Sequence, residues 1–387
     1  MKKHVIVGVG ESARSKRSGR TTLSLGYQAA RRALDDCGMQ ASAIDAVLSY
    51  QDMDACTSHA LAVSLGIHDA TCIELQGGGT LTETLVAQAI GLIELGQASR
   101  VLIFRAMNGR SGLRMGGGAG WGAQEWMNLL PYGAYMVPWG IFAAAHRFAL
   151  VATRHMHDTG LSEEALYAVC QALYDYAQMN PAAMMCGKPL TREGYFDSPY
   201  LAYPFRRHDY CLESDEANAF IVTTADIAAD LPCKPVAIQA VVPRRGSADA
   251  FHYALPKMTD VAGDKVAPEL YARAGIGPDS VNVAAIYDCF SWVIVRQLEA
   301  FGFTEAGASD AFVRAGALTR TGRLPTNTAG GQLAEGYTHG MNNVLEIVRQ
   351  LRGEYRGTDR QVACDTGIVT GWGGPGMASA MLLRSCR

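Results

Sequence analysis

The feature that most limits how this chain can fold is an internal duplication. The segments GMQASAIDAVLSYQD (38–52) and GIGPDSVNVAAIYDC (275–289) share one order: a glycine, a polar turn, a Ser or Asp suited to cap a helix, and an apolar strand. The longer segments 77–104 and 330–364 share another: a glycine bend, a long helix, a glycine-containing stop and a strand. Matches separated by so many residues indicate duplicated domains and not a solenoid of short repeats.

Each half of the duplication alternates strands with helices. Such an order predicts an α/β protein with a mostly parallel sheet in each half, covered on both faces. We place the first half at residues 1–232 and the second at 233–387 of the 387-residue chain. The alignment of the first pair of segments sets Tyr50 opposite Tyr287.

The first half contains a long stretch, about 106–231, that has no counterpart in the second. It begins with an irregular run rich in Gly, Met, Tyr and Trp, continues with a helical pattern over 142–179, and ends in a strand pattern. Long insertions on a rigid scaffold often carry binding surfaces. We expect a lid and substrate-recognition region here, with an apolar surface over 106–139.

Composition excludes several kinds of partner. The net charge is -3 and no long Lys/Arg run occurs, so nucleic acid is an unexpected partner.

No apolar stretch reaches membrane-spanning length, and the N-terminal run fits a buried strand better than a secretory leader. The ten cysteines include no CxxC pair, and His155 and His157 have no nearby third ligand and fit a solvated helix face. We therefore expect a reduced, cytoplasmic chain without a metal site of its own.

Several ordered motifs resemble one protein family. They are NTAGG (327–331) before a helix, YDCFS (287–291) at a strand end, LTREG (190–194) and SDEA (214–217). Together they resemble the thiolase superfamily, and within it the sterol-carrier and lipid-transfer-protein branch. The resemblance covers the whole chain and implies a duplicated thiolase fold: two βαβαβαββ halves stacked in α-β-α-β-α layers.

The chain departs from thiolases at three positions of the expected site. The family's nucleophilic cysteine falls near Gly79, in the run LQGGGTLT. The histidine of the family's HDCF motif is Tyr287 here, and the histidine of its GHPxG motif is Tyr337. A further departure is Glu216, where the family usually has glycine, which leaves the shape of that loop open. Without a nucleophile at Gly79, the acyl-enzyme of Claisen chemistry is unavailable.

One branch of the superfamily combines these departures. Its members resemble thiolases but cleave a β-hydroxyacyl-CoA by a retro-aldol step in bacterial steroid side-chain degradation, using two tyrosines at these motif positions. The resemblance implies that Tyr287 and Tyr337 carry over. It also implies a homodimer that joins a small zinc-ribbon/OB-fold partner in a heterotetramer, with zinc in the partner, no cofactor in this chain and a CoA thioester as substrate.

Retro-aldol chemistry assigns roles to these side chains. A base must take the proton of the β-hydroxyl, donors must stabilise the thioester enolate, and an acid must protonate its α-carbon. We assign Tyr337 as base, favoured by the N-terminus of the following helix, and Tyr287 as acid, with the reverse order open. His339 relays a proton or orients a tyrosine, and Cys289 is a further proton-carrier candidate. The candidate backbone donors to the thioester oxygen are Gly78, Gly79, Gly373 and Gly374.

The resemblance therefore implies an aldolase that cleaves a bulky β-hydroxyacyl-CoA, such as a 17-hydroxy steroid side-chain thioester, into a ketone and a short acyl-CoA such as propionyl-CoA. Two alternatives stay open. One is a cysteine-dependent acyltransferase or thiolase whose nucleophile lies elsewhere, for example at Cys289. The other is a non-catalytic thiolase-like scaffold that binds acyl-CoA.

Overall fold

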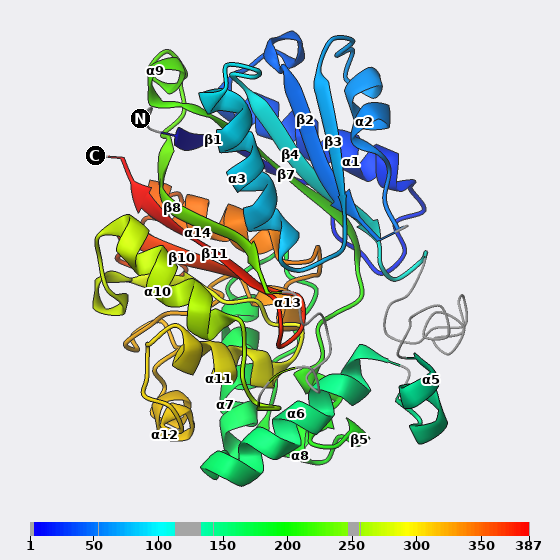
Figure 1. The fold of residues 1–387 in the computed structure, drawn as a ribbon, viewed down its shortest axis with the longest axis vertical. Helices are drawn as coiled ribbons and strands as arrows, with labels where there is room; N and C mark the ends of the chain where they lie inside the picture. Colours follow the sequence, from blue (N-terminus) through cyan, green and yellow to red (C-terminus); the bar gives the residue numbers. More distant parts are fainter. Residues whose placement is uncertain are drawn as a thin grey trace.

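The fold is built on one nine-stranded sheet, described in a computed structural model for residues 4–52, 54–112, 133–141, 143–246, 255 and 257–386. Its strand order is β3-β2-β4-β7-β1-β8-β11-β10-β9. The first five positions belong to the first half of the chain and the last four to the second (Figure 1).

The first half supplies five strands and the helices that cover them. The strands are β1 (His4–Glu11), β2 (Ala46–Gln51), β3 (Thr71–Gln76), β4 (Val101–Asn108) and β7 (Asp215–Thr224). The helices are α1 (Thr22–Cys37), α2 (Ser58–Ser64), α3 (Leu81–Glu94) and the short α9 (Ala225–Ala228).

The second half repeats this plan with four strands. The strands are β8 (Val236–Arg245), β9 (Val283–Ala285), β10 (Thr366–Trp372) and β11 (Ala378–Ser385). The helices are α10 (Gly263–Ala274), α11 (Ser291–Ala300), α12 (Ser309–Arg314), α13 (Gly331–Ala334) and α14 (Met341–Arg352). The position equivalent to β3 is reduced to a single parallel bridge between Ala284 and Thr326.

The excursion between β4 and β7 is mainly helical where the structure describes it. It contains α5 (Gly133–Met136), α6 (Ala144–Thr159), α7 (Glu163–Gln178), α8 (Arg192–Phe196) and a small hairpin of β5 (Tyr200–Ala202) and β6 (Phe205–Arg206). Helix α7 packs against α11, α12 and α13 of the second half. The excursion is narrower than the predicted 106–231, because 106–108 complete β4 and 215–224 form a central strand. Much of the predicted apolar surface over 106–139 lies outside the described residues.

The sheet differs from the two mostly parallel sheets that we expected. Among the described strands of this sheet, the pairs β2–β3, β2–β4 and β9–β10 are parallel. The pairs β1–β7, β4–β7, β1–β8, β8–β11 and β10–β11 are antiparallel. The halves also join directly, where Val5 pairs with Ala237 and Ile6 with Val236. Antiparallel pairing arises because β7 returns from the long excursion and β11 turns straight back from β10.

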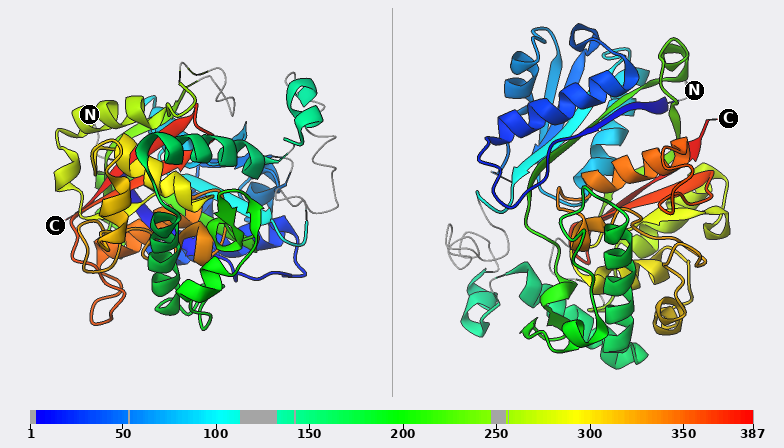
Figure 2. Two further views of the ribbon diagram at one scale, coloured as in Figure 1. Left: turned by 90° about the horizontal axis from the view of Figure 1, so that it is seen from below. Right: turned by 180° about the vertical axis from the view of Figure 1, so that it is seen from behind.

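The layered arrangement is confirmed. Val5 and Val7 pack with α1 while Ile6 faces a middle layer, as expected for alternate residues of a strand. A register shift between Ile6 and Gly8 lets Val9 face that middle layer as well. That middle layer holds α3 and α14, which pack against strands of both halves (Figure 1). Helices α10 and α11 cover the outer face of the second half, and α1 covers that of the first (Figure 2, right). The order is α-β-α-β-α.

Local sequence explains the ends of these helices and the close packing of β1. Thr21 caps α1 by accepting a hydrogen bond from the Ser24 N–H, and Gly38 ends it in the left-handed region at φ 68°. A Cβ at Gly8 would lie 2.2 Å from the Ala33 carbonyl oxygen of α1. Glycine in this strand therefore serves the close approach of α1. No helix in the described ranges combines the length and apolarity needed to cross a bilayer.

Candidate functional site

The two halves meet at the ends of their parallel strands, where chain reversals leave room for side chains. Tyr50 lies in β2, and Tyr287 follows β9 by two residues. The turns that precede the two middle-layer helices, Gly77–Thr80 before α3 and Tyr337–Gly340 before α14, lie at the same place. In α/β sheets this edge of the strands commonly carries the site.

Tyr287 and Tyr337 form a direct pair. Their hydroxyl oxygens are 3.1 Å apart, and either can donate. Tyr287 is 3% exposed, while Tyr337 is partly exposed. Burial, and next the neighbouring Tyr337, raise the pKa of Tyr287 well above its ordinary value. Burial and the neighbouring Cys211 and Cys289 likewise raise the pKa of Tyr337, against the lowering that we expected from the helix N-terminus. Both side chains are therefore phenols at neutral pH.

Tyr337 is held from behind by the SDEA loop. The Ser214 hydroxyl accepts the Tyr337 backbone N–H at 2.8 Å and donates to Glu216 at 3.2 Å. Glu216 is buried and ion-paired to Arg14. A Cβ at Gly336 would lie 2.3 Å from Arg14 Nε, so the chain before Tyr337 packs tightly on this ion pair. The unusual Glu216 thus has a structural partner, which Arg14 supplies from a distant part of the sequence.

His339 lies beside the pair in a conformation that is uncommon for a non-glycine residue. Its φ is 52°, its side chain is buried, and its ring meets that of Tyr337 edge-on with centroids 4.9 Å apart. Its Nδ1 is 3.1 Å from Nη2 of Arg105, which also pairs with Asp54 at 2.5 Å. Burial, and next the Arg105 charge, lower the pKa of His339 to about 3.

Arg105 and Asp54 were missed by the sequence analysis. A charged residue near the end of the apolar run VLIFRAM was the available signal, because an arginine in a buried strand needs a polar partner.

The turn before α3 lies against Tyr287. A Cβ at Gly79 would lie 2.4 Å from Cζ of Tyr287 and 2.2 Å from the Trp372 carbonyl oxygen. The Tyr287 ring thus fills the space that a side chain at position 79 would need. A Cβ at Gly78 would lie 3.0 Å from Nε2 of His339. The structure therefore brings Gly78, Gly79, Tyr287, Tyr337 and His339 together.

The candidate backbone donors differ in availability. The Gly373 N–H already donates to the Met377 carbonyl at 3.2 Å. Gly374 is in the left-handed region at φ 117°, in the turn between β10 and β11. Within the described chain no other group accepts from the N–H of Gly78 or Gly79. Of the four glycines, these two are the better placed to bind a substrate oxygen.

Cys289 is close to the tyrosines but poorly suited to act as a nucleophile. It is buried, and its backbone carbonyl accepts the N–H of Cys211 at 3.0 Å. Burial, and next the neighbouring Cys211 and Asp288, raise the pKa of the Cys289 thiol well above its ordinary value. The adjacent Asp288 is a structural group, since it accepts the backbone N–H groups of Gln332 and Leu333 at the start of α13.

We predicted that His155 and His157 both lie on a solvated helix face, and this is correct for one of them. His157 is exposed, but His155 is buried between Glu299, 3.2 Å away, and Trp292, whose Nε1 donates to its Nδ1. Helix α6 turns this side chain onto α11, which the sequence did not reveal. Among the described residues no group of three His, Cys, Asp or Glu side chains is placed to hold a metal.

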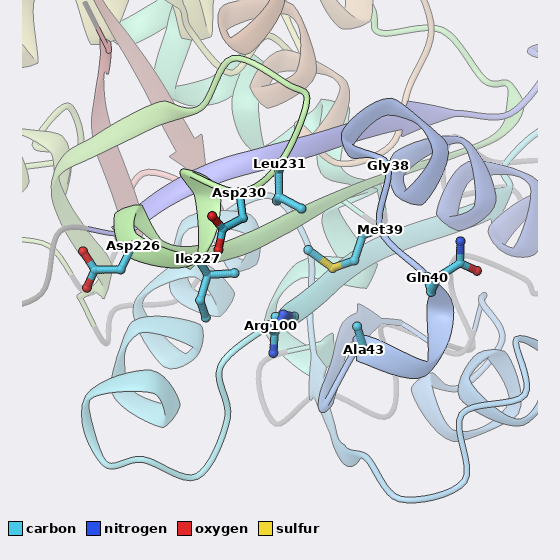
Figure 3. A pocket seen from close by; sticks show the side chains of 9 residues that line it. All are labelled: Gly38, Met39, Gln40, Ala43, Arg100, Asp226, Ile227, Asp230 and Leu231. Atoms are coloured by element: carbon cyan, nitrogen blue, oxygen red, sulfur yellow. The ribbon is translucent and has the colours of Figure 1, made fainter.

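The pocket in Figure 3 lies elsewhere. It has a volume of about 440 Å³ and is lined by residues that include Met39, Arg100 and Asp230. Arg100 directly precedes β4 and Asp230 follows α9, so this pocket opens at the opposite end of the strands from Tyr50. It does not belong to the tyrosine site.

Several known proteins resemble this chain in sequence and fold. Residues 247–385 match the protein family described as "Thiolase C-terminal domain-like". The "17-hydroxy-3-oxo-4-pregnene-20-carboxyl-CoA lyase" of Mycobacterium tuberculosis is 36% identical over 354 residues, or 90% of this chain and 91% of the relative. The "Steroid side-chain-cleaving aldolase" of Thermomonospora curvata is 34% identical over 359 residues, 90% of each chain. The solved "Ltp2-ChsH2(DUF35) aldolase" matches with a TM-score of 0.90 at 31% identity, covering 100% of this chain and 98% of that one.

Proposed function

The chain belongs to the thiolase-fold family of steroid side-chain-cleaving aldolases and is a carbon–carbon lyase, and from this premise we propose a substrate and a mechanism. We propose that it cleaves a bulky β-hydroxyacyl-CoA, of the type of a 17-hydroxy steroid side-chain thioester, into a 17-ketosteroid and propionyl-CoA. The name of the M. tuberculosis relative, which specifies a 17-hydroxy steroid carboxyl-CoA, supports this substrate class.

The pair of tyrosine hydroxyls 3.1 Å apart carries the proposal. In a retro-aldol step the bond between the hydroxyl-bearing carbon and the α-carbon breaks. Its electron pair enters the thioester enolate, the hydroxyl becomes a ketone, and its proton is lost. The α-carbon then gains a proton. The reaction therefore moves one proton over a short path and needs no covalent nucleophile.

The tyrosine pair can carry that proton without forming a free tyrosinate. The substrate hydroxyl passes its proton to Tyr337 as Tyr337 passes its own to Tyr287, and Tyr287 protonates the α-carbon. Both residues end as phenols, ready for the next turnover. Raised pKa values suit this relay, because neither residue has to ionise in the resting enzyme.

Electrostatics favour Tyr337 at the hydroxyl end. Burial raises the pKa of Tyr337, and the Arg105 charge acts in the opposite direction. Negative charge that develops during proton transfer is thus better tolerated on Tyr337. At the other end of the reacting bond, the N–H groups of Gly78 and Gly79 are proposed to hold the thioester oxygen, as in an oxyanion hole.

The assembly is proposed by family likeness. The name of the solved Ltp2-ChsH2(DUF35) aldolase gives two proteins. The match with this chain covers 98% of the aligned chain of that structure. We propose a homodimer of this chain joined to a small zinc-ribbon/OB-fold partner of the DUF35 type in a heterotetramer. Zinc then resides in the partner, and this chain brings no cofactor. The ten cysteines, all within the described residues, form no disulfide there, which supports the proposed reducing, cytoplasmic setting.

The test is an assay of the chain co-expressed with its DUF35-type partner. A C17-hydroxylated steroid side-chain CoA thioester is supplied, and products are identified by mass spectrometry. We expect a 17-ketosteroid and propionyl-CoA from the wild type, and a loss of more than about 100-fold in Tyr287→Phe and Tyr337→Phe. Tyr271→Phe is the matched control, because its hydroxyl only donates to the Phe301 carbonyl.

Other outcomes discriminate the alternatives. Turnover that survives both substitutions would remove the tyrosine relay. Inactivation by iodoacetamide that Cys289→Ser resists would favour a cysteine-dependent acyltransferase. A complex that binds acyl-CoA but cleaves none of a panel of β-hydroxyacyl-CoAs would favour a scaffold.

A further inference from the structure

Arg105 is a fully buried cation beside the tyrosine pair, and the relay above does not use it as an acid or base. It lies in β4, two residues after Ile103, which faces the middle layer. Its guanidinium lies 5.2 Å from the centre of the Tyr50 ring. A buried charge is retained only with close polar partners, so its contacts indicate its purpose.

Those contacts fix the protonation of His339. Nη2 of Arg105 lies 2.5 Å from an Asp54 carboxylate oxygen and 3.1 Å from Nδ1 of His339. A guanidinium has donors and no acceptor, so Nδ1 of His339 must be the acceptor. The proton of the neutral ring is therefore on Nε2. The adjacent positive charge and burial oppose a second proton and lower the pKa of His339.

The backbone aims this N–H at the turn before α3. Tyr50 donates its hydroxyl toward the carbonyls of Thr338 and His339, at 3.1 and 3.2 Å, which holds the turn in its left-handed conformation. Nε2 then lies 3.0 Å from where a Cβ of Gly78 would be. It is thus next to the two backbone N–H groups assigned to the thioester oxygen. Among the described residues, Arg105 is the hydrogen-bond partner of the ring, and Nε2 donates to no other side chain.

We propose that Asp54 and Arg105 are positioning residues that hold His339 as its Nε2–H tautomer, and that this N–H donates to the thioester oxygen of the substrate. The inference rests on the proposed aldolase function and deepens it. Negative charge collects on that oxygen when the enolate forms, and a fixed neutral donor stabilises it there. A neutral imidazole also keeps its proton, so the enolate is protonated at carbon by the tyrosine pair. His339 is then an oxyanion donor and not a proton relay.

The tautomer is measured in the resting protein. The chain is labelled with 15N-histidine in complex with its partner, and His339 is assigned by the signal lost in His339→Gln. We expect an Nε2–H tautomer that stays neutral from pH 8 to pH 5. Arg105→Lys and Asp54→Asn are expected to mix the tautomers or let the ring titrate. Arg352→Lys is the control, since Arg352 is also buried and ion-paired, but with Asp36.

The oxygen contact is measured separately with propionyl-CoA labelled with 13C at its thioester carbonyl. We expect a downfield shift of the bound carbonyl that is kept in His339→Gln, whose amide reaches the Nε2 position, and lost in the shorter His339→Asn. In turnover, His339→Asn is expected to lower kcat by about 100-fold with little change in KM, and His339→Gln by about tenfold.

The outcomes separate the two proposals. A protonated ring at neutral pH or an Nδ1–H tautomer would overturn the inference, and so would equal carbonyl shifts in the wild type, His339→Gln and His339→Asn. If no β-hydroxyacyl-CoA is cleaved, or if propionyl-CoA does not bind, the proposed substrate fails. The resting-state measurement still decides the tautomer in that case.

Discussion

Tyr50 and Tyr287 occupy matching positions of the duplicated halves, yet only one of them is free to do chemistry. Both are buried, at 0% and 3% exposure, and each reaches the turn that precedes the middle-layer helix of the opposite half. The Tyr50 hydroxyl has three partners: the Thr82 hydroxyl at 2.8 Å and the carbonyls of Thr338 and His339. The Tyr287 hydroxyl instead forms a hydrogen bond with the hydroxyl of Tyr337.

The surroundings of the two phenols explain this difference. Tyr50 has a large side chain, that of Arg105, stacked against its ring. Tyr287 is surrounded by glycines: a Cβ at Gly79 would meet its ring at 2.4 Å, and one at Gly340 at 3.0 Å. A satisfied hydroxyl in a filled site holds two halves together, whereas a hydroxyl with spare hydrogen-bonding capacity in a glycine-lined site can meet a substrate. The comparison teaches that hydrogen-bond saturation, and not burial, separates the structural tyrosine from the catalytic candidate.

The sharpest test of this comparison is the same substitution in both halves. Tyr287→Phe should lower turnover by more than about 100-fold and change the free energy of unfolding by less than about 1 kcal/mol. Tyr50→Phe should destabilise by about 1–3 kcal/mol, because it removes the buried hydroxyl that hydrogen-bonds to Thr82 and to the His339 carbonyl. Urea unfolding and product assays of both variants measure the contrast. Equal activity losses with equal destabilisation would break the comparison.

Filling the space around Tyr287 should have the next largest effect. Gly79→Ala places a methyl group within 2.4 Å of the Tyr287 ring, so the ring must move and turnover should fall by at least tenfold. Gly91→Ala is the control within α3, because a Cβ there meets no atom within 4 Å. It should instead stabilise the protein by about 0.5–1 kcal/mol. A Gly79→Ala enzyme with normal turnover would show that Tyr287 need not stay in place.

Removing a contact that holds Tyr337 in place should lower activity less than the substitutions above. Ser214→Ala removes the acceptor of the Tyr337 backbone N–H, and we expect kcat to fall about tenfold through misplacement of the phenol. Ser309→Ala removes a similarly buried hydroxyl that donates to Glu299. Both variants should lose about 1 kcal/mol of stability, but only the first should lose activity. The same activity loss in both would point to general destabilisation.

The smallest effect concerns the third residues of the two middle-layer helices, Glu83 in α3 and Asn343 in α14. Burial raises the pKa of Glu83 from 4.5 to about 7, partly offset by the hydrogen bond from Ser379. Between these values the folded protein binds a proton more tightly than the unfolded chain, so stability falls as pH rises.

Glu83→Gln makes the two helices alike in charge at this position. The decline in unfolding free energy from pH 5 to pH 8 should shrink by about 1–2 kcal/mol, measured by urea titration at both pH values. A residual decline is expected, because burial also raises the pKa of Glu335 to about 7. An unchanged pH dependence would show that Glu83 is not protonated in the folded protein.

Much of this arrangement was accessible from the sequence, because it rests on local signals repeated twice. Glycine bends, caps and apolar runs fix the order of strands and helices, and motif positions led to Tyr287, Tyr337, His339 and Gly79. The parallel or antiparallel sense of each strand pair was not accessible, since the pattern of β7 is the same in either direction. The join of β1 to β8 depends on how two complete halves dock.

The residues that were missed act over long sequence separations. Arg105 and His339 are 234 positions apart, and Ser214 and Tyr337 are 123 apart. No periodicity links such residues; only the docked halves bring them together. The pKa of Tyr337 was predicted in the wrong direction for a related reason. The helix N-terminus is local and visible in sequence, whereas the burial that outweighs it depends on tertiary packing, with Cys211 and Cys289 among the neighbours of Tyr337.

The Tyr287 ring occupies the space that a side chain at position 79 would need, and this has an evolutionary consequence. A cysteine at position 79 with Tyr287 in place would clash, and a smaller residue at 287 with Gly79 in place would leave the site with no thiol at 79 and no phenol at 287. A single substitution in either direction therefore yields a protein with neither chemistry. A lineage that has arrived at this pair is held there by an intermediate of low fitness. Relatives in this family should accordingly carry both residues or neither.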